Sequence, residues 1–426
     1  MQKSMWVRGW KVTILLTCGL LLAGLYGLGL PGASFPGMGS ITEEVYREAQ
    51  SLASTLSLEE KCASVLLVAY GGAKQFVPEF ASRYQRMPVG GVILFAYNIP
   101  QTAEELMDLT DGIRRVGNET GRTPFVAVDH EGGTVFRLKG IATELPDARE
   151  IGRSKASPET VLQLYRVVAR QLAILGFSMN LAPVVEPLTE EIRPFLSRRT
   201  FSSDPTRITE LSEQFLRAMA EAGVVGVAKH FPGSGDGDPH ERLPKSSARP
   251  SDPADPYTLP FRALQQKGVL DAVMVSHVRV PREGVQGPAS LSSVILQNIL
   301  REQWRFEGLI LTDDMRMKSI TQREDPIEGV VRSIQAGADM VMYLGGEYPK
   351  AHAALVRAVR EGRLSPYRLD EAVTRMLAVK IRYGVIKPRR EEPVFKAERL
   401  GEFYRLKREG DVLVQQILYQ ETKSSK

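Results

Sequence analysis

The stretch Leu309-Ile310-Leu311-Thr312-Asp313 is a short run of aliphatic and β-branched residues that ends on a carboxylate. Seven further apolar runs recur along the chain, at residues 63–70, 91–95, 125–129, 180–185, 224–230, 272–277 and 340–344. The runs are nearly continuous in Val, Ile and Leu and do not alternate with polar residues, which is typical of strands covered on both faces. The sequence therefore predicts eight buried strands.

Segments with a helical spacing of apolar residues separate these runs. They lie at residues 103–116, 158–175, 207–222, 293–303, 327–336, 349–361 and 364–384. Strands that alternate with helices predict parallel βα units, and eight such units predict an α/β fold of the (β/α)8 TIM-barrel type in a single catalytic domain. A doubly wound open sheet is the alternative architecture.

Composition excludes several other classes of protein. The chain has 426 residues, of which 43% are hydrophobic and 25% are charged, as in an average globular protein. Its formal net charge of +5 owes much to Lys3, Arg8 and Lys11, because no acidic residue lies before position 43 to balance them. The remainder is close to neutral and carries no electrostatic footprint for nucleic acid. With only Cys18 and Cys62, a disulfide framework is excluded.

Residues 12–30 form an uncharged, largely apolar segment that follows the three basic residues. Residues 1–34 are therefore expected to be a signal peptide or a signal anchor, with the anchor favoured because the small residues of a cleavage site fit poorly. A lipoprotein signal through Cys18 is a weaker alternative, because few apolar residues precede that cysteine. In each case the rest of the chain is expected outside the cytoplasm, either periplasmic or secreted.

The expected organisation follows from these limits. Residues 35–56 are assigned to a linker and a first helix, residues 57–384 to the barrel, and residues 385–426 to a charged tail that is helical from about 402 to 420. The tail is too short for a second α/β domain, so a packed or capping helix is expected.

Polar side chains follow most of the apolar runs. They are Asn98, Asp129, Lys229-His230, His277 and Asp313-Asp314. The carboxyl ends of parallel barrel strands meet at one face, and barrel enzymes carry their chemistry there. This pattern predicts a catalytic site, since core packing alone does not place ionisable groups at strand ends.

The loop that follows the fifth run is rich in glycine and ends in Asp238-Pro239-His240. A phosphate-binding loop is one interpretation, but its glycine spacing and its Lys-Ser/Thr pair are absent. A metal site built from His230, Asp236, Asp238 and His240 is a second, without a recognised ligand spacing. The third is acid/base chemistry by His240, with Asp238 two residues away in an extended loop fixing the tautomer of its ring.

Carboxylates at two other strand ends are candidates for chemistry or binding. Asp313 suits a nucleophile, a general base or a metal ligand, whereas Asp314 better suits the N-cap of the next helix. Asp129 and Arg137 together suit a polyhydroxylated ligand, since both form paired hydrogen bonds to neighbouring hydroxyls. Glu131 is expected to orient neighbouring basic side chains.

These motifs together resemble glycoside hydrolase family 3, in particular its single-domain bacterial β-N-acetylhexosaminidases. The resemblance covers residues 57–384 and rests on stretches that occur in the family's order, namely 90–95 with Asn98, 129–133 with Arg137, 180–184, 199–201 with 204–205, 229–233 with 238–240, 311–315 and 336–340.

The resemblance implies a retaining glycosidase that removes terminal β-linked N-acetylglucosamine, often from peptidoglycan or chitin-type fragments. It assigns Asp313 as the nucleophile and His240, paired with Asp238, as the acid/base. It also implies that the sugar's hydroxyls and acetamido group are held by Asp129, Arg137, Arg199, Lys229 and His230. It implies water as the acceptor, with no metal or other cofactor. A monomer that meets a membrane only through its N-terminal segment is expected.

The chain departs from the family pattern at four positions of these motifs. His130 stands where Gln is common, Thr134 where Arg is common, Ser234 where His is common, and Pro239 where Ser is common. The reaction class is still expected, because Asp313, Asp238 and His240 remain. Substrate preference and turnover are left open by these changes.

Other functions stay open at this point. A neutral imidazole base repels an anionic acceptor less than a carboxylate does, so a phosphorylase that uses phosphate in place of water is a hypothesis to test. A β-glucosidase is the nearest rival among hydrolases, and a metal-dependent hydrolase is a more distant one. A non-catalytic sugar-binding barrel is the alternative from another class of protein.

Overall fold

The computed structural model describes residues 41–72, 74–386 and 395–422. The hydrophobic segment expected at residues 12–30 lies outside these ranges, as do Cys18 and the proposed cleavage region. Within the described ranges, no helix combines the length and the hydropathy needed to cross a bilayer.

The described strands form two parallel sheets and one hairpin. The larger sheet has the order β11-β1-β2-β3-β6-β7, and the smaller has the order β10-β9-β8. In chain order their bounds are Leu66–Ala69 (β1), Gly91–Leu94 (β2), Phe125–Val128 (β3), Met179–Asn180 (β6), Val225–Gly226 (β7), Ala228–Phe231 (β8), Ala272–Val275 (β9), Leu309–Thr312 (β10) and Val341–Tyr343 (β11). The parallel sheets expected from the sequence are therefore present.

Each of the eight apolar runs overlaps a strand, but two runs differ from expectation in length or continuity. The fourth run forms a strand only at Met179–Asn180, and Pro183, which has no N–H to donate, interrupts it. The chain resumes a strand-like path beyond the proline, where Val184 forms an isolated parallel bridge with Lys229. The fifth run forms two strands, β7 and β8, separated by Val227.

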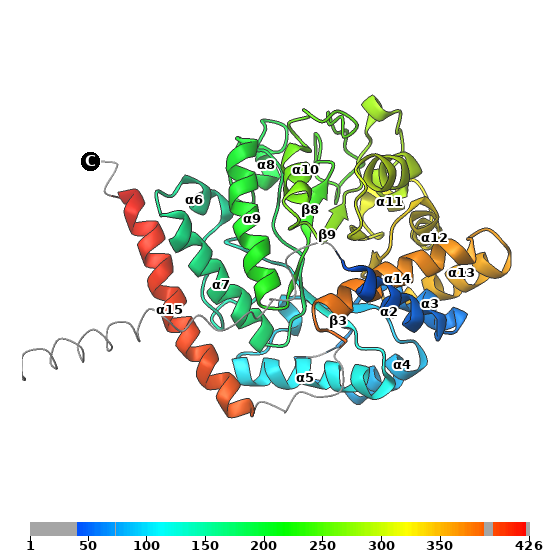
Figure 1. Cartoon of the computed structure of the whole chain (residues 1–426), viewed down its shortest axis with the longest axis horizontal. Coiled ribbons are helices and arrows are strands. Elements are labelled where there is room, and N and C mark those ends of the chain that lie inside the picture. Colours follow the sequence, from blue (N-terminus) through cyan, green and yellow to red (C-terminus); the bar gives the residue numbers. More distant parts are fainter. Residues whose placement is uncertain (1–40, 73, 387–394, 423–426) are drawn as a thin grey trace, which may run out of the picture. The chain divides into compact units, whose positions relative to one another are not determined.

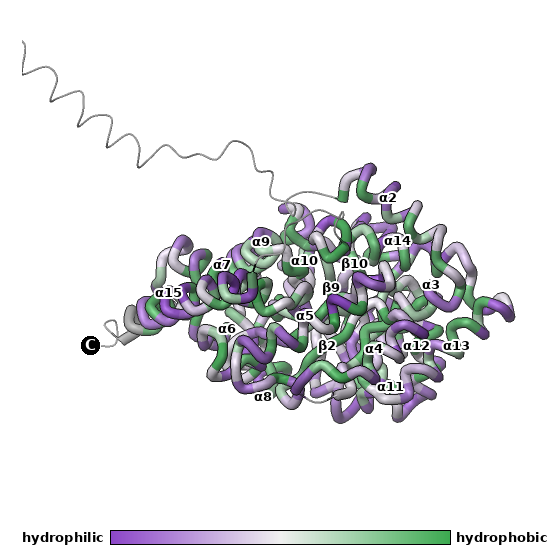
Figure 2. The backbone as a smooth tube through the Cα atoms, turned by 90° about the horizontal axis from the view of Figure 1, so that it is seen from below, coloured by the Kyte–Doolittle hydropathy of each residue, from purple (hydrophilic) through white to green (hydrophobic). Residues whose placement is uncertain are grey.

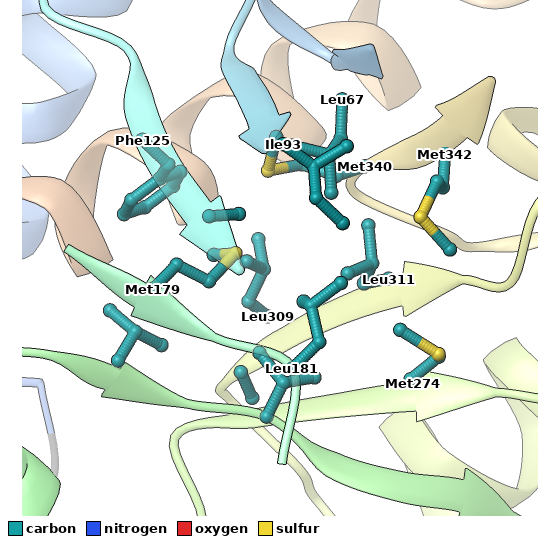
Figure 3. Close-up of a cluster of buried hydrophobic side chains, with 14 of the residues drawn as sticks. Leu67, Ile93, Phe125, Met179, Leu181, Met274, Leu309, Leu311, Met340 and Met342 are labelled. Atoms are coloured by element: carbon teal, nitrogen blue, oxygen red, sulfur yellow. The ribbon is translucent and has the colours of Figure 1, made fainter. Parts of the chain in front are cut away.

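Apolar side chains from both sheets fill the space between the strands. Figure 3 shows them converging from neighbouring strands. They include Leu67, Ile93, Phe125, Met179, Leu181, Met274, Leu309, Leu311, Met340 and Met342, each of which is at most 5% exposed. Burying this much apolar surface without a polar lining makes the interior a packed core and not a channel.

Helices lie around the strands (Figure 1), and hydrophobic and hydrophilic residues alternate along the chain (Figure 2). Their bounds are Glu43–Ser54 (α2), Leu58–Ser64 (α3), Pro78–Arg86 (α4), Ala103–Thr120 (α5), Ala148–Arg153 (α6), Pro158–Ile174 (α7), Arg193–Leu196 (α8), Pro205–Glu221 (α9), Leu259–Gln266 (α10), Lys318–Thr321 (α11), Pro326–Ala336 (α12), Tyr348–Arg360 (α13), Pro366–Arg382 (α14) and Lys396–Thr422 (α15).

Local sequence explains where the longer helices begin and end. Helix α5 begins with a capping box, in which Thr102 accepts from the Glu105 N–H and Glu105 accepts from the Thr102 N–H. It ends at Gly121, whose φ of 68° is in the left-handed region that glycine adopts without steric cost. The helix expected at 293–303 is instead a π-helix, Val294–Gln303.

The C-terminal helix α15 runs alongside α7 (Figure 1). Phe403 and Ile417 on α15 are fully buried, and Arg170 on α7 pairs with Glu402 at 2.7 Å. The tail is therefore a packed helix that covers α7, and it starts earlier than its sequence suggested.

A buried charge cluster ties the amino end of β11 to α14. Asp339 is fully buried and accepts from the Ile310 N–H at 2.9 Å. Its carboxylate also pairs with the guanidinium groups of Arg301, Arg368 and Arg375. Burial by itself raises the pKa of Asp339, but the three cations outweigh burial and hold it below its usual range. This cluster is structural, because it lies at the end of the strands opposite to the carboxyl ends.

Candidate active site

A cavity of about 250 Å³ opens at the carboxyl ends of the strands. It is lined by the eight residues that the family resemblance assigned to catalysis or sugar binding, namely Asp129, Arg137, Arg199, Lys229, His230, Asp238, His240 and Asp313. Glu131, Ser234 and the apolar side chains of Val135, Phe195, Leu196, Met274 and Met342 complete much of its wall. The topology thus brings together side chains that lie far apart in the chain.

Lys229 and His230 both reach the cavity, although they are neighbours in a strand. Successive side chains of a regular strand point to opposite faces. The pairing of β8 with β9 shifts register between Lys229 and Phe231, so His230 is the extra residue of a bulge. A bulge of this kind turns a side chain toward the opposite face, and here it directs a second basic residue into the cavity.

Four charged side chains form a network on one wall, in which Lys229 and Glu131 are buried and Asp129 and Arg199 are partly exposed. The Lys229 ammonium lies 2.8 Å from Asp129 and 2.6 Å from Glu131, and Arg199 forms a bidentate pair with Glu131 at 2.8 and 2.9 Å. Burial raises the pKa of Glu131, but Lys229 and Arg199 outweigh it and lower that pKa to about 2. Glu131 therefore orients the two cations, as the sequence suggested.

A short hairpin carries Glu131 and precedes Arg137. Its strands are His130–Gly132 (β4) and Val135–Phe136 (β5), and they follow β3 directly. Gly132 and Gly133 have φ values of 103° and 54°, and a Cβ on Gly132 would lie 2.3 Å from the Pro146 carbonyl. His130 packs on Phe136 and is fully buried, so it stands outside the cavity.

Asp313 lies at the end of β10 on the cavity surface. One of its oxygens, Oδ1, accepts from the Asp314 N–H at 2.8 Å. Burial raises the pKa of Asp313, but the rings of His277 and His230 and the Asp314 N–H outweigh burial and lower it. The carboxylate is therefore ionised near neutral pH, and Oδ2 accepts no hydrogen bond from the described residues.

His277 supports the segment that carries Asp313 from beneath. It is fully buried, its Nε2 lies 3.0 Å from the Asp314 carbonyl, and its Nδ1 lies 2.6 Å from the Ser290 hydroxyl. A carbonyl only accepts, so Nε2 carries the proton and Ser290 donates to Nδ1. Burial lowers the pKa of His277, which keeps the ring neutral.

His240 and Asp238 face each other on the glycine-rich loop. Asp238 Oδ1 accepts from the His240 N–H at 2.9 Å and from its Nδ1 at 2.7 Å. The expected pair is present, but a turn closes it and not an extended segment, because the Asp238 side chain binds the backbone two residues on. Nδ1 donates to the carboxylate, so Nε2 is the ring atom left for proton transfer.

The glycine-rich loop does not assemble the metal site that its sequence allowed. Asp236 pairs with Arg242 at 3.1 Å and accepts from the Lys245 N–H at 2.8 Å, and it is not part of the cavity wall. Across residues 41–72, 74–386 and 395–422, no three His, Cys, Asp or Glu side chains group as metal ligands.

Glu186 is a site residue that sequence reasoning missed. It is 1% exposed, and its carboxylate lies 2.7 Å from His230 Nδ1. It also accepts from the Ser234 N–H at 2.5 Å and from the Ser234 hydroxyl at 2.8 Å. A signal existed, because Glu186 follows the fourth apolar run just as Asp129 and Asp313 follow theirs.

Two polar strand-end residues and one expected cap have other roles. The Asn98 amide donates to the carbonyls of Tyr70 and Gly72 at 3.1 and 3.0 Å and so joins the loops that follow β1 and β2. His277 is the support described above. Asp314 does not cap a helix as expected, since α11 begins only at Lys318; it accepts from the N–H groups of Arg316 and Leu344.

Comparison with known proteins shows the family to which the chain belongs. The family model described as "Glycosyl hydrolase family 3 N terminal domain" matches residues 57–379. A β-hexosaminidase of Hydrogenovibrio crunogenus is 34% identical over 299 residues, which cover 65% of this chain and 81% of that protein. A β-hexosaminidase of Psychromonas ingrahamii is 35% identical over 260 residues, covering 60% and 75%.

A solved structure shares the fold as well. The glycoside hydrolase family 3 β-N-acetylglucosaminidase of Paenibacillus sp. FPU-7 superposes with a TM-score of 0.73 at 28% identity, over 82% of this chain and 68% of that one. The parallel α/β fold, the cavity and these matches define a glycoside hydrolase. The chain belongs to glycoside hydrolase family 3.

Proposed function

We propose that this protein is a retaining β-N-acetylhexosaminidase that releases terminal β-linked N-acetylglucosamine. One observation carries the proposal: an ionised carboxylate, Asp313, lines the same cavity as an imidazole–carboxylate pair, His240 with Asp238. A nucleophile and a proton donor in one cavity are the two groups that a retaining glycosidase requires. The names of the curated relatives support the choice of hexosamine.

The reaction has two steps. Asp313 Oδ2 attacks the anomeric carbon, and the bond to the leaving oxygen breaks while His240 Nε2 donates a proton to that oxygen. Water then attacks the anomeric carbon of the glycosyl-enzyme and gives a proton back to His240, and the Asp313 carboxylate is released. Asp238 keeps Nδ1 protonated throughout, so the ring exchanges its proton through Nε2 alone.

The rest of the cavity suits a hexosamine ring. Asp129, Arg137, Arg199, Lys229 and His230 offer charged donors and acceptors to hydroxyl and acetamido groups, and the buried ion pairs hold several of them rigid. Val135, Phe195 and Met342 offer an apolar surface to the C–H face of the ring and to the acetyl methyl group. Peptidoglycan or chitin-type fragments are the proposed natural substrates.

The test is a paired assay of wild type and Asp313→Asn on an aryl β-N-acetylglucosaminide and an aryl β-glucoside. We expect wild type to prefer the N-acetylglucosaminide, and we expect Asp313→Asn to lose at least about 10³-fold in kcat, because a neutral amide is a poor nucleophile. A preference for the glucoside would identify a β-glucosidase, and binding without release in both proteins would identify a sugar-binding protein.

The acceptor and the need for metal are tested in the same assay. Repeating it with phosphate separates hydrolysis, which yields N-acetylglucosamine, from phosphorolysis, which yields its 1-phosphate. We expect the free sugar. Loss of the rate on addition of EDTA would contradict the metal-free mechanism.

We also propose that the strands close into one eight-stranded barrel, in which β7 and β8 count as one strand. Three features support closure: β7 and β8 are separated by a single residue, Val184 bridges to Lys229, and Leu311 bridges to Met340, which joins β10 to the segment before β11. An experimental structure with the β10 and β11 segments apart would contradict it.

The catalytic part is proposed to act outside the cytoplasm. The support is the uncharged segment at residues 12–30 behind Lys3, Arg8 and Lys11. A reporter enzyme that is active only when exported is expected to be active when fused after residue 426. A full-length fusion whose reporter stays inactive would refute the proposal.

A further inference from the structure

Glu186 contacts two parts of the candidate active site, the cavity wall at His230 and the glycine-rich loop at Ser234. Its oxygen Oε1 accepts from His230 Nδ1, and both of its oxygens accept from Ser234. His230 is a wall residue of the cavity, whereas Ser234 lies at the beginning of the loop that carries Asp238 and His240. One buried carboxylate therefore joins the binding wall to the base of the proton-donating loop.

The chemistry of these contacts requires a carboxylate. Every described hydrogen bond of the Glu186 carboxylate comes from a donor: the ring and the N–H of His230, and the N–H and hydroxyl of Ser234. A carboxylate accepts at both oxygens, whereas an amide of the same shape offers one oxygen and an NH2 group. In Glu186→Gln the amide NH2 would face either the His230 ring N–H or the Ser234 N–H.

The contact with His230 also sets the tautomer of its ring. Because Glu186 accepts, Nδ1 carries a proton, and Nε2 is the ring atom that remains for a ligand. Nε2 has no hydrogen-bond partner among the described residues. The Glu186 side chain is 2% exposed and that of His230 is 11% exposed, so the orientation is held by surrounding protein.

We propose that Glu186 is a positioning residue that couples the sugar-binding orientation of His230 to the placement of the catalytic loop through Ser234. The coupling runs through Ser234, whose N–H and hydroxyl both donate to the Glu186 carboxylate. The inference rests on the proposed hydrolase function for its kinetic consequences, but the hydrogen-bond arrangement exists without substrate.

The kinetic test compares three variants on an aryl β-N-acetylglucosaminide. We expect Glu186→Gln to raise KM and to lower kcat, with a combined loss of about tenfold to hundredfold in kcat/KM, the usual range for a lost charge-assisted hydrogen bond. Ser234→Ala is expected to lower kcat by about threefold to tenfold with KM within about twofold, because only the loop loses its anchor. Glu190→Gln is the matched control, since Glu190 lies in the same segment, is 84% exposed and pairs with Arg193 alone among the residues that the structure describes.

A second measurement separates positioning from a loss of folding. The chain has five histidines, so histidine-labelled protein gives a resolvable nitrogen NMR spectrum. In wild type we expect a slowly exchanging Nδ1 proton on His230, absent from His230→Gln and lost or rapidly exchanging in Glu186→Gln. Thermal unfolding of the three variants is recorded alongside.

The outcomes are distinct. A Glu186→Gln enzyme with unchanged kcat/KM, or with an unchanged His230 Nδ1 signal, overturns the proposal, as does a Ser234→Ala enzyme that changes KM alone. If wild type does not hydrolyse the aryl glycoside, the proposed function fails, whereas the NMR comparison still tests the coupling. A Glu186→Gln protein that unfolds is replaced by Glu186→Asp, for which a shorter reach predicts the same loss of the Nδ1 signal.

Discussion

Two imidazole–carboxylate pairs with the same contact distance serve one cavity. His230 and Glu186 lie 2.7 Å apart with side chains 11% and 2% exposed, and His240 and Asp238 lie 2.7 Å apart with side chains 72% and 37% exposed. The first pair sits at a strand bulge inside the fold, and the second sits in a turn of a loop. Chemistry alone does not distinguish them, but their surroundings do.

The difference teaches how one fold assigns separate tasks to one kind of pair. A buried ring whose partner also holds Ser234 keeps a single orientation, which suits recognition of a sugar. An exposed ring on a loop exchanges protons with water and can approach a leaving oxygen, which suits acid/base catalysis. The predictions below test this division, beginning with the largest effect.

Replacing the exposed histidine should separate activity from stability. We expect His240→Gln to lower kcat by about 10²- to 10⁴-fold, because the leaving oxygen loses its proton donor. Unfolding free energy should change by less than about 0.5 kcal/mol, since the side chain is largely in solvent. Steady-state kinetics and urea unfolding on the same sample measure both.

His230→Gln provides the comparison for that variant. Its expected pattern is the reverse, with a raised KM and a lowered midpoint of unfolding, because it leaves Glu186 as a buried carboxylate without its ring partner. If His230→Gln and His240→Gln change kcat, KM and stability alike, the difference in burial does not give the two histidines different roles.

A buried carboxylate away from the cavity should affect stability alone. We expect Asp339→Asn to lower the free energy of unfolding by about 3–5 kcal/mol, because it leaves Arg301, Arg368 and Arg375 as cations without their shared counter-ion. The rate per folded molecule should not change. Glu371→Gln is the control, as Glu371 contacts two of the same arginines but is partly exposed, and its expected cost is below about 1 kcal/mol. An Asp339→Asn protein as stable as wild type would contradict the interpretation.

The carboxyl beside the nucleophile should reveal itself in the pH dependence of stability. Burial, the main cause, raises the pKa of Asp314 to about 6, whereas an unfolded aspartate titrates near ~3.9. Between these pH values the folded protein holds a proton that the unfolded chain has lost, so wild type loses stability as pH rises through this window. Asn keeps the acceptor for Arg316 and Leu344 but does not titrate.

We expect the free energy of unfolding of Asp314→Asn, relative to that of wild type, to rise by about 2 kcal/mol between pH 4 and pH 7. Denaturant unfolding at pH 4, 5, 6 and 7 measures it. If the free energies of unfolding of the two proteins change in parallel with pH, the pKa of Asp314 is the same in the folded and unfolded states, which would contradict the prediction.

Much of the fold could be predicted from the sequence, because a buried strand requires a continuous run of apolar residues. The runs at 125–129 and 309–313 became β3 and β10, and each is followed by a cavity carboxylate. The strand predicted at 180–185 was wrong in extent, because Pro183 has no backbone N–H to donate. The segment at 293–303 is helical as expected, but nothing in its spacing distinguishes a π-helix from an α-helix.

The sequence predicted which residues line the cavity better than it predicted the hydrogen bonds and ion pairs between them. Asp313, His240 and the residues proposed to bind the sugar share one cavity, as the family resemblance implied. The strand-end pattern by itself indicated only some of them. Glu186 escaped notice, and Asn98 and His277 proved to be structural, because a polar residue after a strand looks the same in sequence whether it faces a cavity or a neighbouring loop.

The sequence by itself determined the alternation of buried strands and amphipathic helices, the strand-end placement of the reactive groups and the membership of the family. These properties depend on periodicity and motif order, which are local. Only the tertiary structure decided which imidazole is buried and which is exposed, and which carboxylate holds which cation. Those properties depend on contacts between residues distant in the chain, such as Lys229 with Asp129 and His230 with Glu186, and on the solvent that packing removes around them.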